Sequence, residues 1–135
     1  MASFDLLDSG ERAQYDTGAQ RDTAEGKGRF DLISAEALAR LSRVMELGAK
    51  KYNDRNWEKG IPLARCLDSA LRHINQWQRG LRDEDHLSQA VFNLFAIIHL
   101  GDLIDYGSLP RHLLEGLPNR AILTHFPDRA AVESS

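Results

Sequence analysis

Apolar side chains recur three and four residues apart in three segments of the chain, which is the spacing of one helix face. In the first segment these positions are Leu38, Leu41, Val44 and Met45. Ser34 is suited to cap the start of a helix, and the charge of Glu36 suits its first turn. The pattern predicts a helix that begins near Ser34 and ends at Gly48.

A second helix is predicted to start near Pro62, because proline is tolerated in a first turn, and to end before Gly80. A third is predicted from the acidic residues 83–85 to about Tyr106, and it is apolar on most of its circumference. Such a helix belongs in the middle of a bundle or in a subunit interface. We therefore expect a homodimer or homotetramer rather than a monomer.

The two ends of the chain lack this periodicity. Residues 1–30 predict an irregular N-terminal arm, and prolines and glycines break residues 108–135 into short pieces. Of these pieces, residues 111–115 suggest one or two helical turns, and residues 121–126 have some strand character. The prediction is a single domain, residues 1–135, of the all-α class. It is a small bundle of about three principal helices over residues 31–107, with irregular N- and C-terminal arms.

Charge and cysteine content narrow the function classes. The formal net charge of −3 argues against binding of polymeric nucleic acid or of an anionic membrane. The apolar stretch at residues 91–100 is interrupted by polar residues and is too short to span a bilayer. One cysteine, Cys66, excludes an intramolecular disulfide, and no leader-like segment stands at the N-terminus. We expect a cytoplasmic protein.

Residues 48–57 combine cations, amides and two aromatic rings in one connector. Lys50 and Lys51 can donate to anionic oxygens, Asn56 can donate and accept, and Tyr52 and Trp57 offer flat faces to a ring. The alternative is a solvated loop with its tryptophan packed in the core.

The predicted second and third helices also carry polar groups beside their apolar faces. His86, Gln89 and Asn93 share one stripe, which must find partners in another helix, in water or in a ligand. On the second helix, Arg72 and His73 diverge by about 100°, so only one of them can face the bundle. Arg72 could instead pair with a carboxylate one turn earlier, and His73 could be a core residue.

A glycine pair around residue 27 frees the backbone to approach a ligand, and Lys27 and Arg29 suit a phosphate. Asp31 could orient Arg29 or cap a turn. Hydrolysis of a phosphoanhydride would also call for carboxylates that converge on Mg²⁺ or Mn²⁺. The candidate metal ligands are Glu46, Asp68, Asp83 and Asp85.

Four separated motifs resemble the phage and bacterial family named dATP/dGTP diphosphohydrolase, N-terminal domain. They agree with it in order and approximate spacing across about residues 27–100. The motifs are residues 27–33, residues 48–52 with Asn56 and Trp57, Arg72 with His73, and His86 with Leu87 and Asn93.

The resemblance implies a relative of the MazG-like nucleotide pyrophosphohydrolases, which are helical, assemble as dimers or tetramers and act on nucleoside triphosphates. Those enzymes hold metals with an E-x-x-E helix followed by an E-x-x-D helix. This chain departs from them. Its second helix has Ser69 and Arg72 at the corresponding positions, and its third has His86 and Gln89.

Two functions follow, both with a small purine nucleotide as partner. In the first, an enzyme that uses Mg²⁺ or Mn²⁺ cleaves a deoxynucleoside triphosphate to monophosphate and pyrophosphate, with His73 or His86 positioning water. In the second, a protein without a cofactor sequesters an intact nucleotide. That nucleotide could be a cyclic or ADP-ribose-type signal in the cytoplasm of a phage's host. The expected ligand contacts are Lys27, Arg29, Asp31, Lys50, Lys51, Tyr52, Asn56, Trp57, Arg72, His73, Trp77, His86, Gln89 and Asn93.

Overall fold

The computed structural model describes residues 10–117, which fall into two compact units that divide after Ser34. Within the first unit, strands β1 (Arg12–Gln14) and β2 (Gln20–Asp22) form an antiparallel hairpin in which Arg12 pairs with Asp22. The Arg12 guanidinium also donates to the Asp22 carboxylate over 2.9 Å. The prediction of a wholly irregular arm was wrong here, because strands of three residues are too short to show alternation.

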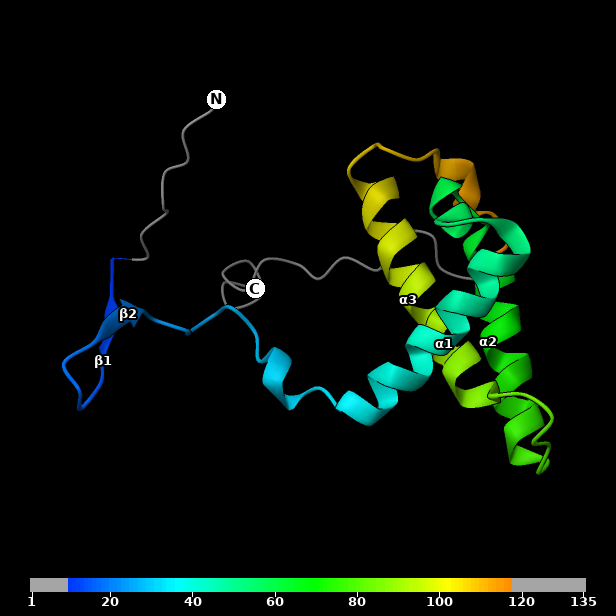
Figure 1. Ribbon diagram of the computed structural model, residues 1–135. Helices are drawn as coiled ribbons and strands as arrows, with labels where there is room; N and C mark the ends of the chain where they lie inside the picture. The colour runs from blue at the N-terminus through cyan, green and yellow to red at the C-terminus, as the bar shows by residue number, and fades with distance from the viewer. Residues whose placement is uncertain (1–9, 118–135) are drawn as a thin grey trace. The chain divides into compact units, whose positions relative to one another are not determined.

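The second unit contains three helices: α1 (Ala35–Tyr52), α2 (Leu63–Gln78) and α3 (His86–Asp105), as Figure 1 shows. A short 3₁₀ turn, Asn56–Lys59, precedes α2, and another, Arg111–Leu114, follows α3. A third, Phe30–Leu32, belongs to the first unit. The predicted all-α class with three principal helices is confirmed. The suggested strand at residues 121–126 lies outside the described residues.

The predicted end of the first helix at Gly48 was wrong, because α1 continues for one more turn to Tyr52. Glycine weakens a helix interior by only about 1 kcal/mol, and Lys50 and Lys51 in the last turn complement the helix dipole. The chain leaves the helix at Asn53, whose φ of 81° is left-handed. Half of the predicted connector is therefore helical.

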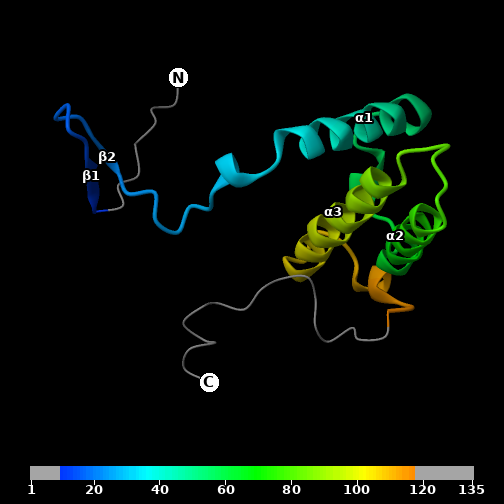
Figure 2. The same ribbon diagram turned by 90° about the horizontal axis from the view of Figure 1, so that it is seen from below.

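Helices α2 and α3 lie side by side and run antiparallel, and α1 packs at an angle against α3 (Figure 2). The hydrophobic core occupies one end of the pair, where α2 begins and α3 ends. Its buried members are Leu63, Cys66, Ala96, Leu100, Ile104, Leu113 and Leu114. At the other end the buried helix positions are small or polar, namely Ala70, His86, Ser88 and Ala90.

Much apolar surface of these helices stays open. α1 buries none of its residues fully, although its apolar positions follow a helical period. On α3, Phe95 and Ile98 remain more than half exposed. Among the described residues, α3 is the one helix whose length and composition would allow it to cross a membrane. Core helices of soluble proteins share this property, and α3 packs against both other helices. The apolar run is therefore longer than residues 91–100 suggested.

Candidate functional site

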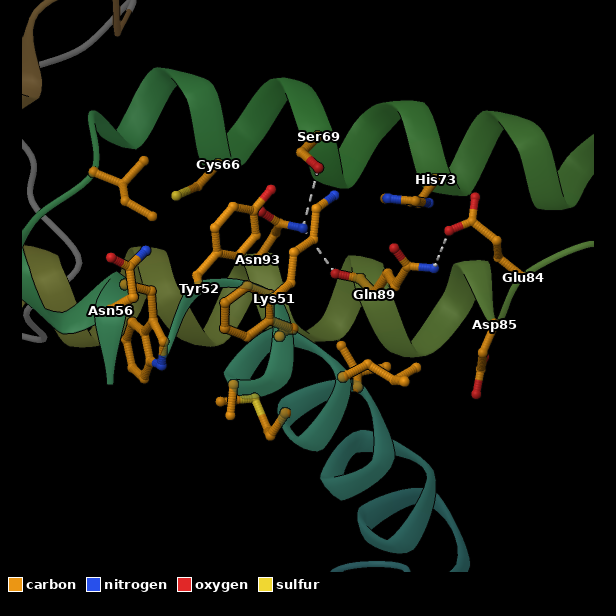
Figure 3. Close-up of a pocket in the computed structure, with 18 of the residues that line it drawn as sticks. Lys51, Tyr52, Asn56, Cys66, Ser69, His73, Glu84, Asp85, Gln89 and Asn93 are labelled. Carbon is orange, nitrogen blue, oxygen red and sulfur yellow. Dashed lines mark hydrogen bonds between the residues drawn. The ribbon is translucent and has the colours of Figure 1, made fainter. Parts of the chain in front are cut away.

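A pocket of about 830 Å³ lies where the end of α1 and the connector after it meet α2 and α3. In Figure 3, Cys66, Ser69 and His73 follow one another along α2. Glu84, just before α3, and then Gln89 and Asn93 on α3 follow in the opposite direction. Lys51 and Tyr52 reach into the space between these two helices from the end of α1. The pocket is thus built from the second unit.

Trp57 fixes the connector against α3. Two left-handed residues, Asn53 and Arg55, turn the chain after α1, and a 3₁₀ turn follows. The indole then meets Phe92 edge to face at a centroid distance of 5.7 Å and His99 at 5.0 Å. Trp57 therefore both packs on the core and lines the pocket, and its contact with a ligand stays a prediction.

Lys51 and Tyr52 form a cation–π pair at the pocket wall, with the ammonium 5.2 Å from the ring centroid. Both side chains are exposed, and the tyrosine keeps 54% of its surface open. A flat ring and a positive charge are consequently available together to a bound ligand.

The polar stripe of α3 faces α2, and two of its members line the pocket. The Asn93 side-chain amide donates to the Ser69 hydroxyl at 3.2 Å and to the backbone carbonyl of Gln89 at 2.9 Å. The Gln89 amide donates to Glu84 at 3.2 Å. The stripe is therefore an interhelical network and a pocket wall at once.

His86, the third member of the stripe, lies behind the pocket and is only 2% exposed. Its Nε2 is 2.8 Å from the Asp83 carboxylate, and its Nδ1 is 3.0 Å from Nδ1 of His73, which lines the pocket. Burial, and after it the neighbouring His86, lowers the pKa of His73. The hydrogen bond from His86 lowers the pKa of Asp83.

The profile of the family described as dATP/dGTP diphosphohydrolase, N-terminal, matches residues 17–107. The chain belongs to this family. A dATP/dGTP diphosphohydrolase of Salmonella phage PMBT28 is 28% identical over 81 residues, which cover 56% of this chain and 28% of that protein. No solved structure gives a significant match.

Several of the predicted site residues lie away from the pocket. Lys50 points to solvent near Glu46, at 4.0 Å, and Arg72 pairs with Asp68 one turn earlier on the exposed side of α2. Trp77 lies near the end of α2 under the Arg82 guanidinium. These side chains were predicted as ligand contacts or metal ligands, but helix geometry turns them outward. Besides His86, which lies behind the pocket, the predicted site residues of the second unit that do not line it are Glu46, Lys50, Asp68, Arg72 and Trp77.

Lys27, Arg29 and Asp31 belong to the first unit. There the Arg29 guanidinium donates twice to Asp31, over 2.8 Å for each bond. This pairing agrees with the suggestion that Asp31 orients Arg29, and both side chains are exposed. Their contact with a nucleotide stays a prediction.

The predicted metal ligands form no common site. Asp85 pairs with Arg40, and Asp83 is bonded to His86. Glu46 on α1 and Asp68 on α2 each lie near a cation one turn later on the same helix. Within residues 10–117, the one group of three candidate ligands whose atoms lie within 4.8 Å is Asp83, Glu84 and His86. Both ring nitrogens of His86 already have partners, so these residues do not fit a resident Mg²⁺ or Mn²⁺.

The structure also adds pocket residues that the sequence did not single out. The connector after α1 brings Arg55, and α2 contributes Arg65 and Ser69. Glu84 and Phe92 come from the region of α3. The helical period alone could have indicated Ser69, which lies one turn before His73 on the same face.

Asp85 joins the pocket to the start of α3. Its carboxylate accepts two bonds from Arg40 of α1, at 2.6 and 2.9 Å, and one from the backbone N–H of Ser88 as the helix cap. The bonds from Arg40, and after them that from Ser88, hold the pKa of Asp85 far below its usual range. The ionised carboxylate therefore stabilises the fold above the unfolded-state pKa, and this contribution is lost as the pH falls below it.

We expect Asp85→Asn to lower the free energy of unfolding by about 1 kcal/mol at pH 7, because asparagine still caps α3 but loses the ion pair with Arg40. The difference from the wild type should shrink as the pH falls below about 4, where the unfolded carboxyl is protonated. Urea unfolding at a series of pH values measures this, with Asp105→Asn at the far end of α3 as the matched variant. A difference that is constant from pH 7 to pH 3 would contradict the assignment.

Proposed function

We propose that the pocket binds a purine nucleotide, with the cations of the connector and of α2 on its phosphates and the aromatic side chains on its base. The observation that carries the proposal is the joint placement of Lys51, Arg55, Arg65 and Tyr52 around one cavity. Charge-assisted donors beside an open ring suit a phosphorylated base. Membership of the dATP/dGTP diphosphohydrolase family supports this class of ligand.

Hydrolysis to a monophosphate and pyrophosphate is the reaction that the family's description suggests for such a ligand. His73 lines the pocket and could position the attacking water, while His86 would act through it. The family membership does not by itself establish this activity, because the matched segment covers only 28% of the phage relative. We therefore state hydrolysis as a proposal.

Capture of an intact nucleotide without hydrolysis is the second candidate. It is favoured by a specific observation: the carboxylates expected to bind Mg²⁺ or Mn²⁺ are paired with Arg40, Arg72 and His86 or lie near Lys50. A sponge needs no cofactor, and the contacts to phosphate and base are the same in both cases. Its ligand would be a cyclic or ADP-ribose-type nucleotide as readily as a triphosphate.

One experiment separates the two candidates. The protein is incubated with dATP, dGTP and a panel of cyclic and ADP-ribose-type nucleotides with Mg²⁺ or Mn²⁺, then denatured by heat, and the nucleotides are separated by chromatography. Monophosphate with pyrophosphate would establish hydrolysis. Depletion from the native solution followed by release of the unchanged compound would establish capture. If no nucleotide is depleted or cleaved, nucleotide binding itself is refuted.

Two adjacent lysines offer a matched test of the phosphate contact. Lys51→Ala should weaken nucleotide binding at least about tenfold, because a hydrogen bond to a charged group contributes about 1.5–3 kcal/mol. Lys50→Ala removes the same charge from the same helical turn but from outside the pocket, and should change the affinity by less than about twofold. Isothermal titration calorimetry measures both. Equal losses would point to the overall charge rather than to a contact.

We further propose that the chain forms a homodimer or homotetramer through the open apolar surface of α1 and α3. Leu38 on α1 and Phe95 and Ile98 on α3 each expose more than half of their surface, which is costly in a monomer. Burial of these side chains against a second copy would remove that apolar area from water.

Phe95→Asp should therefore shift the molar mass in solution from the oligomer to the monomer, because a charge cannot be buried there without a partner. Light scattering after size-exclusion chromatography measures the mass, and circular dichroism checks that the helices remain. Leu71→Asp is the comparison, since Leu71 is equally exposed on α2. A wild-type protein that is monomeric at high concentration would refute the proposal.

A further inference from the structure

Three side chains form an unbroken hydrogen-bonded chain that ends in the pocket. It starts at Asp83, whose side chain is 69% exposed, passes through His86, whose side chain is 1% exposed, and ends at His73. The two steps measure 2.8 Å and 3.0 Å, and the imidazole centroids are 5.2 Å apart. Among its members, His73 and Asp83 line the cavity, and His86 connects them from behind.

The direction of each hydrogen bond in this network follows from which atoms can donate a proton. An ionised carboxylate only accepts, so Nε2 of His86 must carry the proton that bonds to Asp83. In a neutral His86 ring this is the one ring proton, so its Nδ1 is an acceptor. Nδ1 of His73 must then donate to it, and Nε2 of His73 is left without a proton. The lowered pKa of His73 agrees with a neutral ring at pH 7.

The side chains around His73 indicate which part of a nucleotide could donate a hydrogen bond to its Nε2. Glu84 and Asp85 stand at the same end of the pocket, where α3 begins (Figure 3). Phosphate would meet repulsion from Glu84, whose hydrogen-bond partner is the neutral Gln89 amide, whereas Asp85 is already paired with Arg40. Arg65 lies eight residues earlier on α2, about 12 Å away along the helix axis, so the cationic end of the pocket is the opposite one.

We propose that Nε2 of His73 accepts a hydrogen bond from the nucleoside part of the ligand, either a sugar hydroxyl or an amino group of the base, and that His86 and Asp83 are positioning residues that hold it in this tautomer. The ligand contact rests on the proposed nucleotide binding. The tautomer itself is a property of the free protein. The Asp83–His86–His73 network thus orients the nucleotide in the pocket, with phosphates toward Arg65 and nucleoside toward His73. This orientation belongs to the capture candidate, because water positioned by His73 would require the scissile phosphate at this end of the pocket.

Nuclear magnetic resonance of the full chain labelled with ¹⁵N-histidine tests the tautomers directly. At pH 7 without ligand, His73 should show a protonated Nδ1 and a bare Nε2, and His86 should show the reverse. Asp83→Ala should release this preference, so that His73 takes up the Nε2–H tautomer or a mixture. Asp105→Ala, which removes an exposed acid at the other end of α3, should leave both rings unchanged. A doubly protonated His86, or the same tautomers in Asp83→Ala, would overturn the assignment of positioning residues.

Addition of dATP then tests the ligand contact, with binding measured independently by calorimetry. The Nε2 signal of His73 should move toward the position of a hydrogen-bonded acceptor, while the His86 signals move less. If dATP binds and the Nε2 signal does not move, the proposed contact is wrong although nucleotide binding is right. If dATP and the other nucleotides do not bind, the proposed function fails and the contact fails with it. In that case the tautomers measured in the free protein still test whether Asp83 and His86 hold His73 in the proposed form.

Discussion

The antiparallel packing of α2 and α3 is the constraint on which the rest of the structure depends. Apolar burial is concentrated at one end of this pair, where Leu63 and Leu100 are almost completely buried. At the other end the helices meet through alanines, a serine and two histidines, so hydrogen bonds align the helices there instead of a large apolar core. A pair held in this way leaves space between its helices that apolar side chains do not fill, and the pocket occupies that space.

The connector after α1 closes the pocket because of a single anchor. Trp57 packs its indole on α3, which fixes the chain between α1 and α2 without the help of long apolar segments. Lys51 and Tyr52, in the last turn of α1, are thereby directed into the space between the other two helices. The same stretch thus contains a packing residue and ligand-facing residues, and these roles depend on each other.

The sequence was sufficient for the helices whose boundaries have a strong local cause. Pro62 marks the start of α2, and Asp85 caps α3. The end of α1 was missed because the helix tolerates Gly48 when cations follow. For the site, helix periodicity correctly grouped Gln89 with Asn93, but it could not show that Arg72 faces solvent, since the direction of a helix face depends on which neighbour covers it. Contacts between α2 and α3 are nonlocal, so no sequence pattern could reveal the pairing of their histidines.

Cys66 gives this architecture a built-in reporter. Its thiol borders the pocket yet is only 3% exposed, and burial raises its pKa, so it reacts poorly while α2 and α3 are closed on each other. It is also the one cysteine of the chain. A thiol reagent therefore reacts when the helix pair opens, and when reclosing is faster than modification the rate of that reaction measures the equilibrium between closed and open states.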